Sequence, residues 1–225
     1  MLHRPVEVDI SPEAPTTNRI EQYIAFVQKA DKRQLLIDLI EGQMVACGIV
    51  FTRTKHGANR LAKQLSKVGI PSDSIHGDKS QTARTRALNA FRNGDVFILV
   101  ATDIASRGID VEDITHVFNF DLPNEPEVYI HRIGRTARAG RDGLAYSFCD
   151  ETESGYLVGI QRLLGEDIEV LEDQPYHFEK ARPKPGQKPG RVKGAPVGGR
   201  SRRGTGRGGS MRRYNRGGQK RNEHN

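Results

Sequence analysis

Two arginines three positions apart follow a glycine in the string HRIGRTAR, residues 131–138. If this segment is helical, Arg135 and Arg138 occupy neighbouring positions, and Gly134 leaves room for a ligand to approach closely. Two guanidinium groups directed at one point suit the negative charge that develops on a phosphoryl group during its transfer. The alternative is that both arginines pair with carboxylates on the surface of the domain.

A second candidate for ligand binding is the string ATDIASRGID, residues 101–110. Asp110 closely follows Gly108, and a carboxylate on such a turn can accept both hydrogens of a ribose diol. Asp103 comes directly after an apolar run and before a short helical pattern. We interpret Asp103 as a helix N-cap or as a partner in an internal salt bridge.

Polar residues also follow the apolar run GIVF, residues 48–51. Thr52, Arg53 and Thr54 stand before a helical pattern, where hydroxyl and backbone N–H groups can hold phosphate oxygens. The histidines His76 and His116 are interpreted as strand-end or packing residues. The two cysteines, Cys47 and Cys149, each lie in an apolar run without a metal-ligand spacing, which predicts buried reduced thiols.

These polar residues must be positioned by strands that alternate with helices along the chain. Apolar runs and alternation predict strands over residues 20–27, 45–51, 74–76, 96–100, 116–120 and 144–149. Helical spacing and capping residues predict helices over 31–41, 56–68 and 81–92, another that begins at Pro126, and one over 151–164. The pattern predicts an open, mostly parallel α/β sheet with helices on both faces. Ligands of such sheets bind at the carboxyl ends of strands, here residues 51–54, 75–78 and 101–103.

The charge of the 225-residue chain is divided unevenly. Residues 176–225 hold 15 Lys and Arg against two acids, whereas residues 1–175 carry a net charge of −6. We therefore expect a mildly acidic domain over 18–170, a linker over 1–17, and a basic, disordered tail over 171–225. No stretch approaches the ~18–20 apolar residues of a membrane span, and the first residues lack a secretory signal. This predicts a cytoplasmic protein with no membrane partner.

Four strings together resemble a known family. Residues 48–62, 75–91, 101–110 and 129–140 are similar, in this order, to motifs IV, IVa, V and VI of DEAD-box ATP-dependent RNA helicases. The resemblance covers residues 18–165, and the tail and spacing are most similar to the bacterial RhlE-type subgroup. His131 resembles the DEAD-box rather than the DEAH-type pattern, and residues 138–143 echo a motif of RecQ-type DNA helicases.

The resemblance implies a RecA-like C-terminal domain and assigns roles to its residues. Arg135 and Arg138 are implied to be arginine fingers toward ATP, with His131 and Arg132 in the same catalytic motif. Asp110, with Arg107 and Gly108, is implied to bind the ribose of ATP. RNA contacts are implied for Thr52, Arg53, Thr54, Gly77, Gln81, Arg84 and Thr102. The tail arginines Arg202, Arg203, Arg207, Arg212 and Arg213 are expected to attract RNA by releasing counterions.

The chain lacks both GxxxxGK[ST] and the DEAD tetrad. We therefore expect ATP and Mg²⁺ to be held mainly by an N-terminal lobe of similar architecture, assign no metal ligand in this chain, and predict that the chain alone does not hydrolyse ATP. Residues 6–17 resemble a linker between two such lobes. The expected function is RNA holding and local duplex unwinding, with low sequence specificity. The alternatives are a non-enzymatic RNA-binding or annealing module and, third, a DNA helicase.

Overall fold

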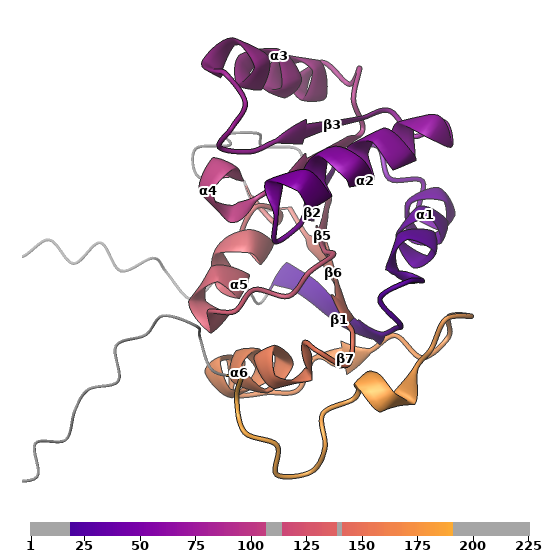
Figure 1. Cartoon of the computed structure of the whole chain (residues 1–225), viewed down its shortest axis with the longest axis vertical. Helices are drawn as coiled ribbons and strands as arrows, with labels where there is room; N and C mark the ends of the chain where they lie inside the picture. The colour runs from indigo at the N-terminus through magenta and orange to yellow at the C-terminus, as the bar shows by residue number, and fades with distance from the viewer. Residues whose placement is uncertain (1–18, 107–113, 139–140, 191–225) are drawn as a thin grey trace, which may run out of the picture. The chain divides into compact units, whose positions relative to one another are not determined.

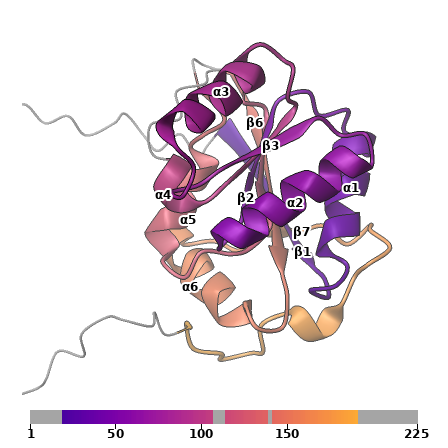
Figure 2. The same ribbon diagram turned by 45° about the horizontal axis from the view of Figure 1, so that its top comes forward.

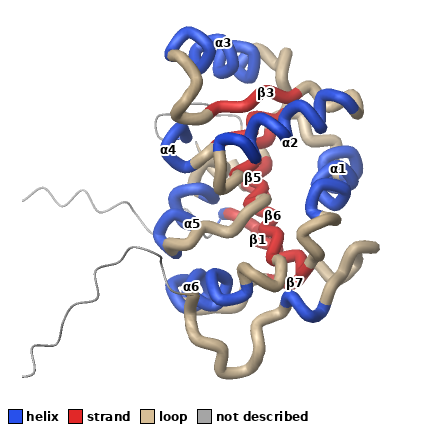
Figure 3. The backbone as a smooth tube through the Cα atoms, in the orientation of Figure 1, coloured by secondary structure: helices blue, strands red, loops and turns tan. Residues whose placement is uncertain are grey.

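The computed structural model describes residues 19–106, 114–138 and 141–190 of the chain. Within them one sheet holds seven strands in the order β3-β4-β2-β5-β6-β1-β7, and every neighbouring pair is parallel (Figures 1 and 3). The strands are β1 Ile20–Phe26, β2 Gly48–Phe51, β3 Ser72–Ile75, β4 Ile98–Ala101, β5 His116–Asn119, β6 Gly143–Cys149 and β7 Glu169–Val170. The predicted parallel α/β sheet is confirmed.

Helices cover both faces of this sheet (Figures 1 and 2). They are α1 Lys32–Gly42, α2 Lys55–Lys67, α3 Gln81–Arg92, α4 Asp103–Ser106, α5 Pro126–Ile133 and α6 Ser154–Leu164. The helices α1 and α2 pack against one face, and α3, α5 and α6 pack against the other. Every residue of β2, β4 and β5 is buried, as expected for strands that are covered on both sides.

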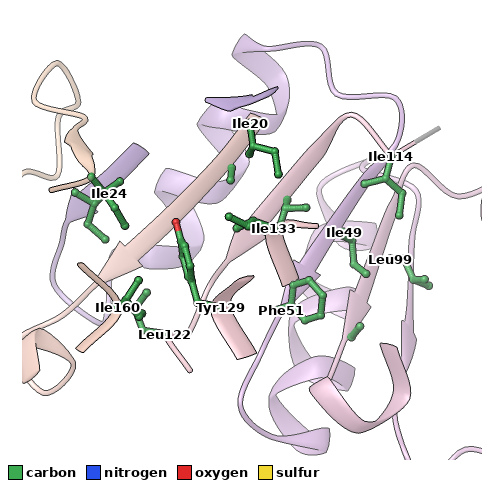
Figure 4. Packing of buried hydrophobic residues seen from close by; sticks show 14 of the residues in the cluster. Ile20, Ile24, Ile49, Phe51, Leu99, Ile114, Leu122, Tyr129, Ile133 and Ile160 are labelled. Carbon is green, nitrogen blue, oxygen red and sulfur yellow. The ribbon is translucent and has the colours of Figure 1, made fainter. Parts of the chain in front are cut away.

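The side-chain alternation of the strands builds two separate cores. Ile49 and Phe51 of β2 join Tyr129 and Ile133 of α5 in one core (Figure 4). Val50, between them in the sequence, contributes to the other core beneath α1 and α2. Adjacent strand residues point to opposite faces of a sheet, so one short apolar run fills both layers.

Capping residues set the starts of the helices near the site. The Ser80 Oγ accepts a hydrogen bond from the Ala83 N–H at 3.2 Å, so α3 begins where the sequence predicts. The Thr54 Oγ1 accepts from the Gly57 N–H at 3.0 Å and caps α2. Pro126 occupies the first turn of α5, where its missing N–H costs no helical hydrogen bond.

The folded body continues beyond the predicted boundary at residue 171. The Leu171 N–H donates to the Ile24 carbonyl and the Phe178 N–H donates to the Phe26 carbonyl, each at 2.9 Å. A short 3₁₀ helix, Glu179–Ala181, follows, and Ala181 is fully buried. The boundary was misplaced because the average composition of this region is polar, although its few apolar residues pack against β1. The tail arginines lie outside the described residues.

None of the helices in the described ranges is both long and apolar enough to cross a membrane. Neither cysteine is in a disulfide: Cys149 is buried and Cys47 is half-buried.

Candidate functional site

Three turns lie side by side at the carboxyl edge of the sheet. The Thr52 N–H donates to the Ala101 carbonyl at 3.0 Å, which joins the ends of β2 and β4. The Thr102 N–H donates to the Ile75 carbonyl at 3.2 Å and joins β4 to β3. Residues 52–54, 76–78 and 102–103, which the sequence assigns to three separate motifs, therefore form one continuous edge. Together with Gln81 and Arg84 of α3 we call it the RNA edge, because the family resemblance implies RNA contacts for its residues.

The side chains of the RNA edge differ in their access to solvent. Thr54, Gly77 and Gln81 are exposed, whereas Thr102 and Arg84 are half-buried. The Arg84 Nη2 donates weakly to the Ala105 carbonyl, at 3.4 Å, which directs the side chain across the turn after β4.

Thr52 differs from its neighbours because its side chain is buried. Its Oγ1 donates to the Thr54 carbonyl at 3.3 Å, inside the turn. A ligand at this edge meets the backbone of Thr52 rather than its hydroxyl group.

Arg53 is held by a carboxylate that the sequence analysis did not single out. The Arg53 Nη2 donates to Glu153 Oε1 at 2.6 Å and to the Leu122 carbonyl at 3.2 Å. Its guanidinium lies 5.4 Å from the ring centre of Tyr156, and its backbone N–H donates to Asp121 Oδ2 at 2.8 Å. The Arg53 side chain is still 41% exposed, so it is oriented by these contacts and reachable from solvent.

Glu153 belongs to a buried charge cluster with Lys32 and Asp150. The Lys32 ammonium contacts both carboxylates and donates to the Phe120 carbonyl at 3.1 Å. Burial raises the pKa of the Glu153 carboxyl, and the charge of Lys32 opposes this rise. Burial also acts to raise the pKa of Asp150, but hydrogen bonds from Thr152 and the charge of Lys32 lower it overall. Lys32 and Glu153 are 121 positions apart, so no local pattern could reveal the pair.

Arg132, grouped above with the catalytic residues, points into the domain. It is 2% exposed, and its Nε and Nη2 donate to the two oxygens of Asp103 at 2.6 and 2.9 Å. Its Nη1 donates to Asn119 Oδ1 and to the Asp121 carbonyl, and its guanidinium lies 5.0 Å from the Phe51 ring centre. The internal salt bridge predicted for Asp103 is confirmed. The buried guanidinium makes Arg132 a positioning residue that joins α5 to the RNA edge.

The second and third arginines of the HRIGRTAR string lie on a turn rather than on a helix, contrary to the helical arrangement considered above. The helix α5 ends at Ile133, and the Arg135 N–H donates to the Arg132 carbonyl at 3.0 Å. Ala137 then adopts a left-handed conformation with φ of 56°, which ends any helical path before Arg138. Burial and the nearby charge of Arg138 lower the pKa of Arg135, so the turn brings the two charges together. We call residues 134–138 the arginine turn.

A threonine and a glycine that the sequence analysis passed over fix the arginine turn. Thr136 is fully buried, and its Oγ1 contacts the Ile114 and Thr115 carbonyls at 2.5 and 3.1 Å. Gly143 packs so closely beneath it that a Cβ there would lie 2.4 Å from Thr136 Oγ1. Ile114 and Thr115 directly precede β5 and Gly143 begins β6, so the arginine turn lies at the amino edge of the sheet. The two arginines therefore lie away from the carboxyl ends of the strands, where the sequence predicts a ligand site.

The remaining candidate residues are placed as follows. His131 is exposed at the end of α5, and its carbonyl accepts from Arg135 Nε at 3.3 Å. Arg107, Gly108 and Asp110 lie outside the described residues. His76 directly follows β3 and His116 is the first residue of β5, and both are buried, which agrees with their interpretation as strand-end or packing residues. Among the described residues, no group of three His, Cys, Asp or Glu side chains could hold a metal ion.

The parallel sheet, with polar turns at one edge and paired arginines at the other, defines a RecA-like lobe of the kind found in helicases. The model of the helicase conserved C-terminal domain matches residues 31–140. The chain is 41% identical to the DEAD-box ATP-dependent RNA helicase CshA of Geobacillus kaustophilus over 171 residues, which cover 76% of this chain and 37% of CshA.

Solved structures agree with this similarity. The chain matches Escherichia coli DEAD-box protein SrmB, solved bound to the regulator of ribonuclease activity A, with 36% identity and a TM-score of 0.64. The match covers 76% of this chain and 97% of that SrmB chain. Saccharomyces cerevisiae Dbp5, solved with RNA and ADP BeF3, matches with 37% identity and a TM-score of 0.60, over 67% of this chain and 40% of Dbp5. The chain therefore belongs to the DEAD-box helicase family, as its C-terminal RecA-like domain. It spans 33–38% of the length of the curated relatives it matches.

Proposed function

We propose that this chain supplies the second lobe of an ATP-dependent RNA helicase, which holds RNA and completes the ATP site of an N-terminal RecA-like lobe. The arginine turn carries the proposal: two arginines on a short turn are held at a defined place by the buried Thr136. In this proposal, closure of the two lobes brings Arg135 and Arg138 to the triphosphate of ATP. RNA holding at the opposite edge then becomes coupled to ATP use.

The chemistry of the arginine turn fits an anionic ligand. The low pKa of Arg135 reflects its burial and the repulsion from Arg138, and a polyphosphate placed against both groups relieves that repulsion. ATP with Mg²⁺, bound mainly by the other lobe, supplies the transferable phosphoryl group. Arg135 and Arg138 stabilise negative charge on that group, while Thr136 holds the backbone that carries them. Asp110, with Arg107 and Gly108, is proposed to hold the ribose, and His131 to face the same cleft.

The RNA edge fits a sugar–phosphate backbone. It presents the Thr54 hydroxyl, the guanidiniums of Arg53 and Arg84, the half-buried Thr102, the side chain of Gln81, and backbone at Thr52 and Gly77. Such groups contact phosphate and sugar without distinguishing base edges, so the proposed binding has little sequence preference. The similarity to Dbp5, which was solved with RNA, supports this assignment. The tail arginines named above would add attraction without sequence preference.

The test combines this chain with an N-terminal lobe that carries the Walker A and DEAD motifs, and measures RNA-stimulated phosphate release. Replacing Arg135 and Arg138 by glutamine should lower the turnover by about 10³-fold or more, the usual value of an arginine finger. Arg141→Gln, an exposed arginine three residues further along the chain, is the matched control and should retain activity. Turnover that survives the double replacement would contradict the proposal.

Two finer assignments belong to the same proposal. The RhlE-type subgroup rests on the resemblance of the tail and the spacing. A cytoplasmic location agrees with two cysteines that form no disulfide. ATP-independent annealing driven by the basic tail is the competing function, and the family membership favours the helicase lobe. Replacing RNA by DNA strands of equal length in the phosphate-release assay separates the RNA helicase from a DNA helicase.

A further inference from the structure

The helix α2 carries positive charge that neither the arginine turn nor the RNA edge uses. Over its 13 residues it holds four Lys and Arg and no acidic residue. Arg60, Lys63 and Lys67 recur at helical spacing on its exposed side, opposite the buried Leu61 and Leu65. None of these three bases forms an ion pair with a residue that the structure describes. We call them the α2 ridge; α2 itself crosses the front of the domain in Figure 2.

A hollow lies beside the α2 ridge, between α2 and the edge strand β3. Its volume is about 330 Å³, and Lys63, Lys67 and Lys79 are among the residues that line it. One acid, Asp73, also lines the hollow, and it pairs with Lys79 at 2.7 Å. Two of the three ammonium groups are thus left without a described acidic partner. The hollow is suited to a negatively charged group.

Two segments that line the hollow lead to the RNA edge. The α2 helix begins directly after its cap Thr54, and Lys79 follows Gly77 by two residues. The turn over residues 76–79 is closed by a hydrogen bond from the Lys79 N–H to the His76 carbonyl at 3.1 Å. At about 1.5 Å per residue, α2 extends roughly 20 Å away from Thr54. An RNA strand held at the RNA edge can therefore continue along α2 and past the hollow.

The groups around the hollow favour phosphate without base recognition. The serine hydroxyls that line it already donate: Ser66 to the Ser72 carbonyl, Ser72 to the Ile70 carbonyl, and Ser74 to Asn59 Oδ1. These hydroxyls are therefore already engaged within the protein, and a ligand in the hollow would meet mainly the lysine ammonium groups, which are compact charges on flexible side chains. Such groups hold a polyanion through its charge and set little geometric requirement.

We propose that the α2 ridge and the adjoining hollow bind the phosphates of an RNA strand that continues beyond the RNA edge. This inference rests on the proposed function and extends its RNA site along α2. Charge complementarity and continuity with the RNA edge favour RNA over an acidic protein as the occupant. The ridge lengthens the bound strand and adds no sequence preference.

The test measures binding of the full chain to fluorescent RNA strands of about six and about 25 nucleotides over a range of salt concentrations. The triple variant R60Q/K63Q/K67Q should bind the longer strand more weakly. The slope of log K against log salt should fall in magnitude by about 2, since each single-strand phosphate contact contributes about 0.7. Binding of the short strand should stay nearly unchanged.

The control R33Q/R162Q/K180Q removes the same charge from exposed positions on other elements. Equal losses in the two triple variants, or no loss in the ridge variant, overturn the proposal. Arg84→Gln separates this failure from failure of the proposed function. If Arg84→Gln weakens binding of the short strand while the ridge variant binds both strands like the wild type, the RNA edge is supported and the ridge proposal is refuted. If Arg84→Gln weakens the binding of neither strand, the RNA edge itself is refuted.

A footprint on the unmodified chain avoids any effect of substitution on folding. The longer RNA should protect Lys63 and Lys67 from an amine-acylating reagent, with the exposed Lys180 as the reference. The short RNA should leave both lysines reactive. Equal protection by polyglutamate at the same salt concentration would overturn RNA as the occupant and favour an acidic protein.

Discussion

Gly143→Ala is expected to displace the arginine turn. A Cβ at Gly143 would lie 2.4 Å from both Thr136 Cγ2 and Thr136 Oγ1, and 2.9 Å from the Ala137 backbone nitrogen. Thr136 cannot simply turn aside, because it is fully buried and its hydroxyl contacts two carbonyls at the start of β5. The added methyl group must therefore move the backbone of the arginine turn.

The magnitude follows from overpacking and from the hydrogen bonds at risk. Overpacking a tight site costs about 1–3 kcal/mol, and loss of a Thr136 hydrogen bond adds about 1 kcal/mol. We expect the free energy of unfolding to fall by about 2–4 kcal/mol, read from urea denaturation at an unchanged m value. RNA-stimulated phosphate release with the N-terminal lobe should fall as well, under conditions where the variant is still folded.

A double-mutant cycle tests the stated cause. Thr136→Ala removes the two side-chain atoms nearest the new methyl group and leaves only the Ala137 nitrogen, so the double variant should be destabilised by less than the sum of the single variants. Gly42→Ala is the control, since a Cβ there meets nothing within 4 Å; it should be neutral or slightly stabilising. Additive effects at Gly143 and Thr136, or no destabilisation by Gly143→Ala, would refute the reasoning.

Three further predictions concern the RNA edge and the core. A Cβ at Gly77 meets nothing within 4 Å, so Gly77→Ala should leave the urea midpoint unchanged while weakening RNA binding; equal RNA affinity would show that no ligand approaches there. Arg132→Met removes the guanidinium that donates to Asp103, Asn119 and the Asp121 carbonyl and should lower the free energy of unfolding in urea by about 2–4 kcal/mol; a loss below about 0.5 kcal/mol would contradict this reasoning. Burial lowers the pKa of His116, so the unfolded chain binds more protons and stability should fall as the pH drops below about 6.5. His116→Phe keeps an aromatic ring against Phe118 and Tyr146 and should reduce this loss of stability between pH 7.5 and 5.5. An unchanged pH dependence would contradict His116 as its cause.

Local signals predicted most of the elements because they act within a few residues. Ser80 caps α3 by a bond to an N–H three positions away, and Pro126 marks the first turn of α5. The apolar runs of β2 and β4 predicted strands buried on both faces, although the strands begin two or three residues later than predicted. The short β7 and the chain after residue 171 were missed because their contacts are with β1, far away in the sequence.

The sequence by itself determined the order of strands and helices, their parallel arrangement and the motifs that assign the family, since these depend on local propensity, periodicity and residue identity. Only the tertiary structure decided what each charged side chain contacts. Arg132 turned out to be buried against Asp103, and Arg53 to be held by Glu153 across 100 positions. The arginine turn depends on the contact between Thr136 and Gly143. Ion pairs and close packing join residues that are distant along the chain, so their partners are fixed only when the sheet brings its strands together.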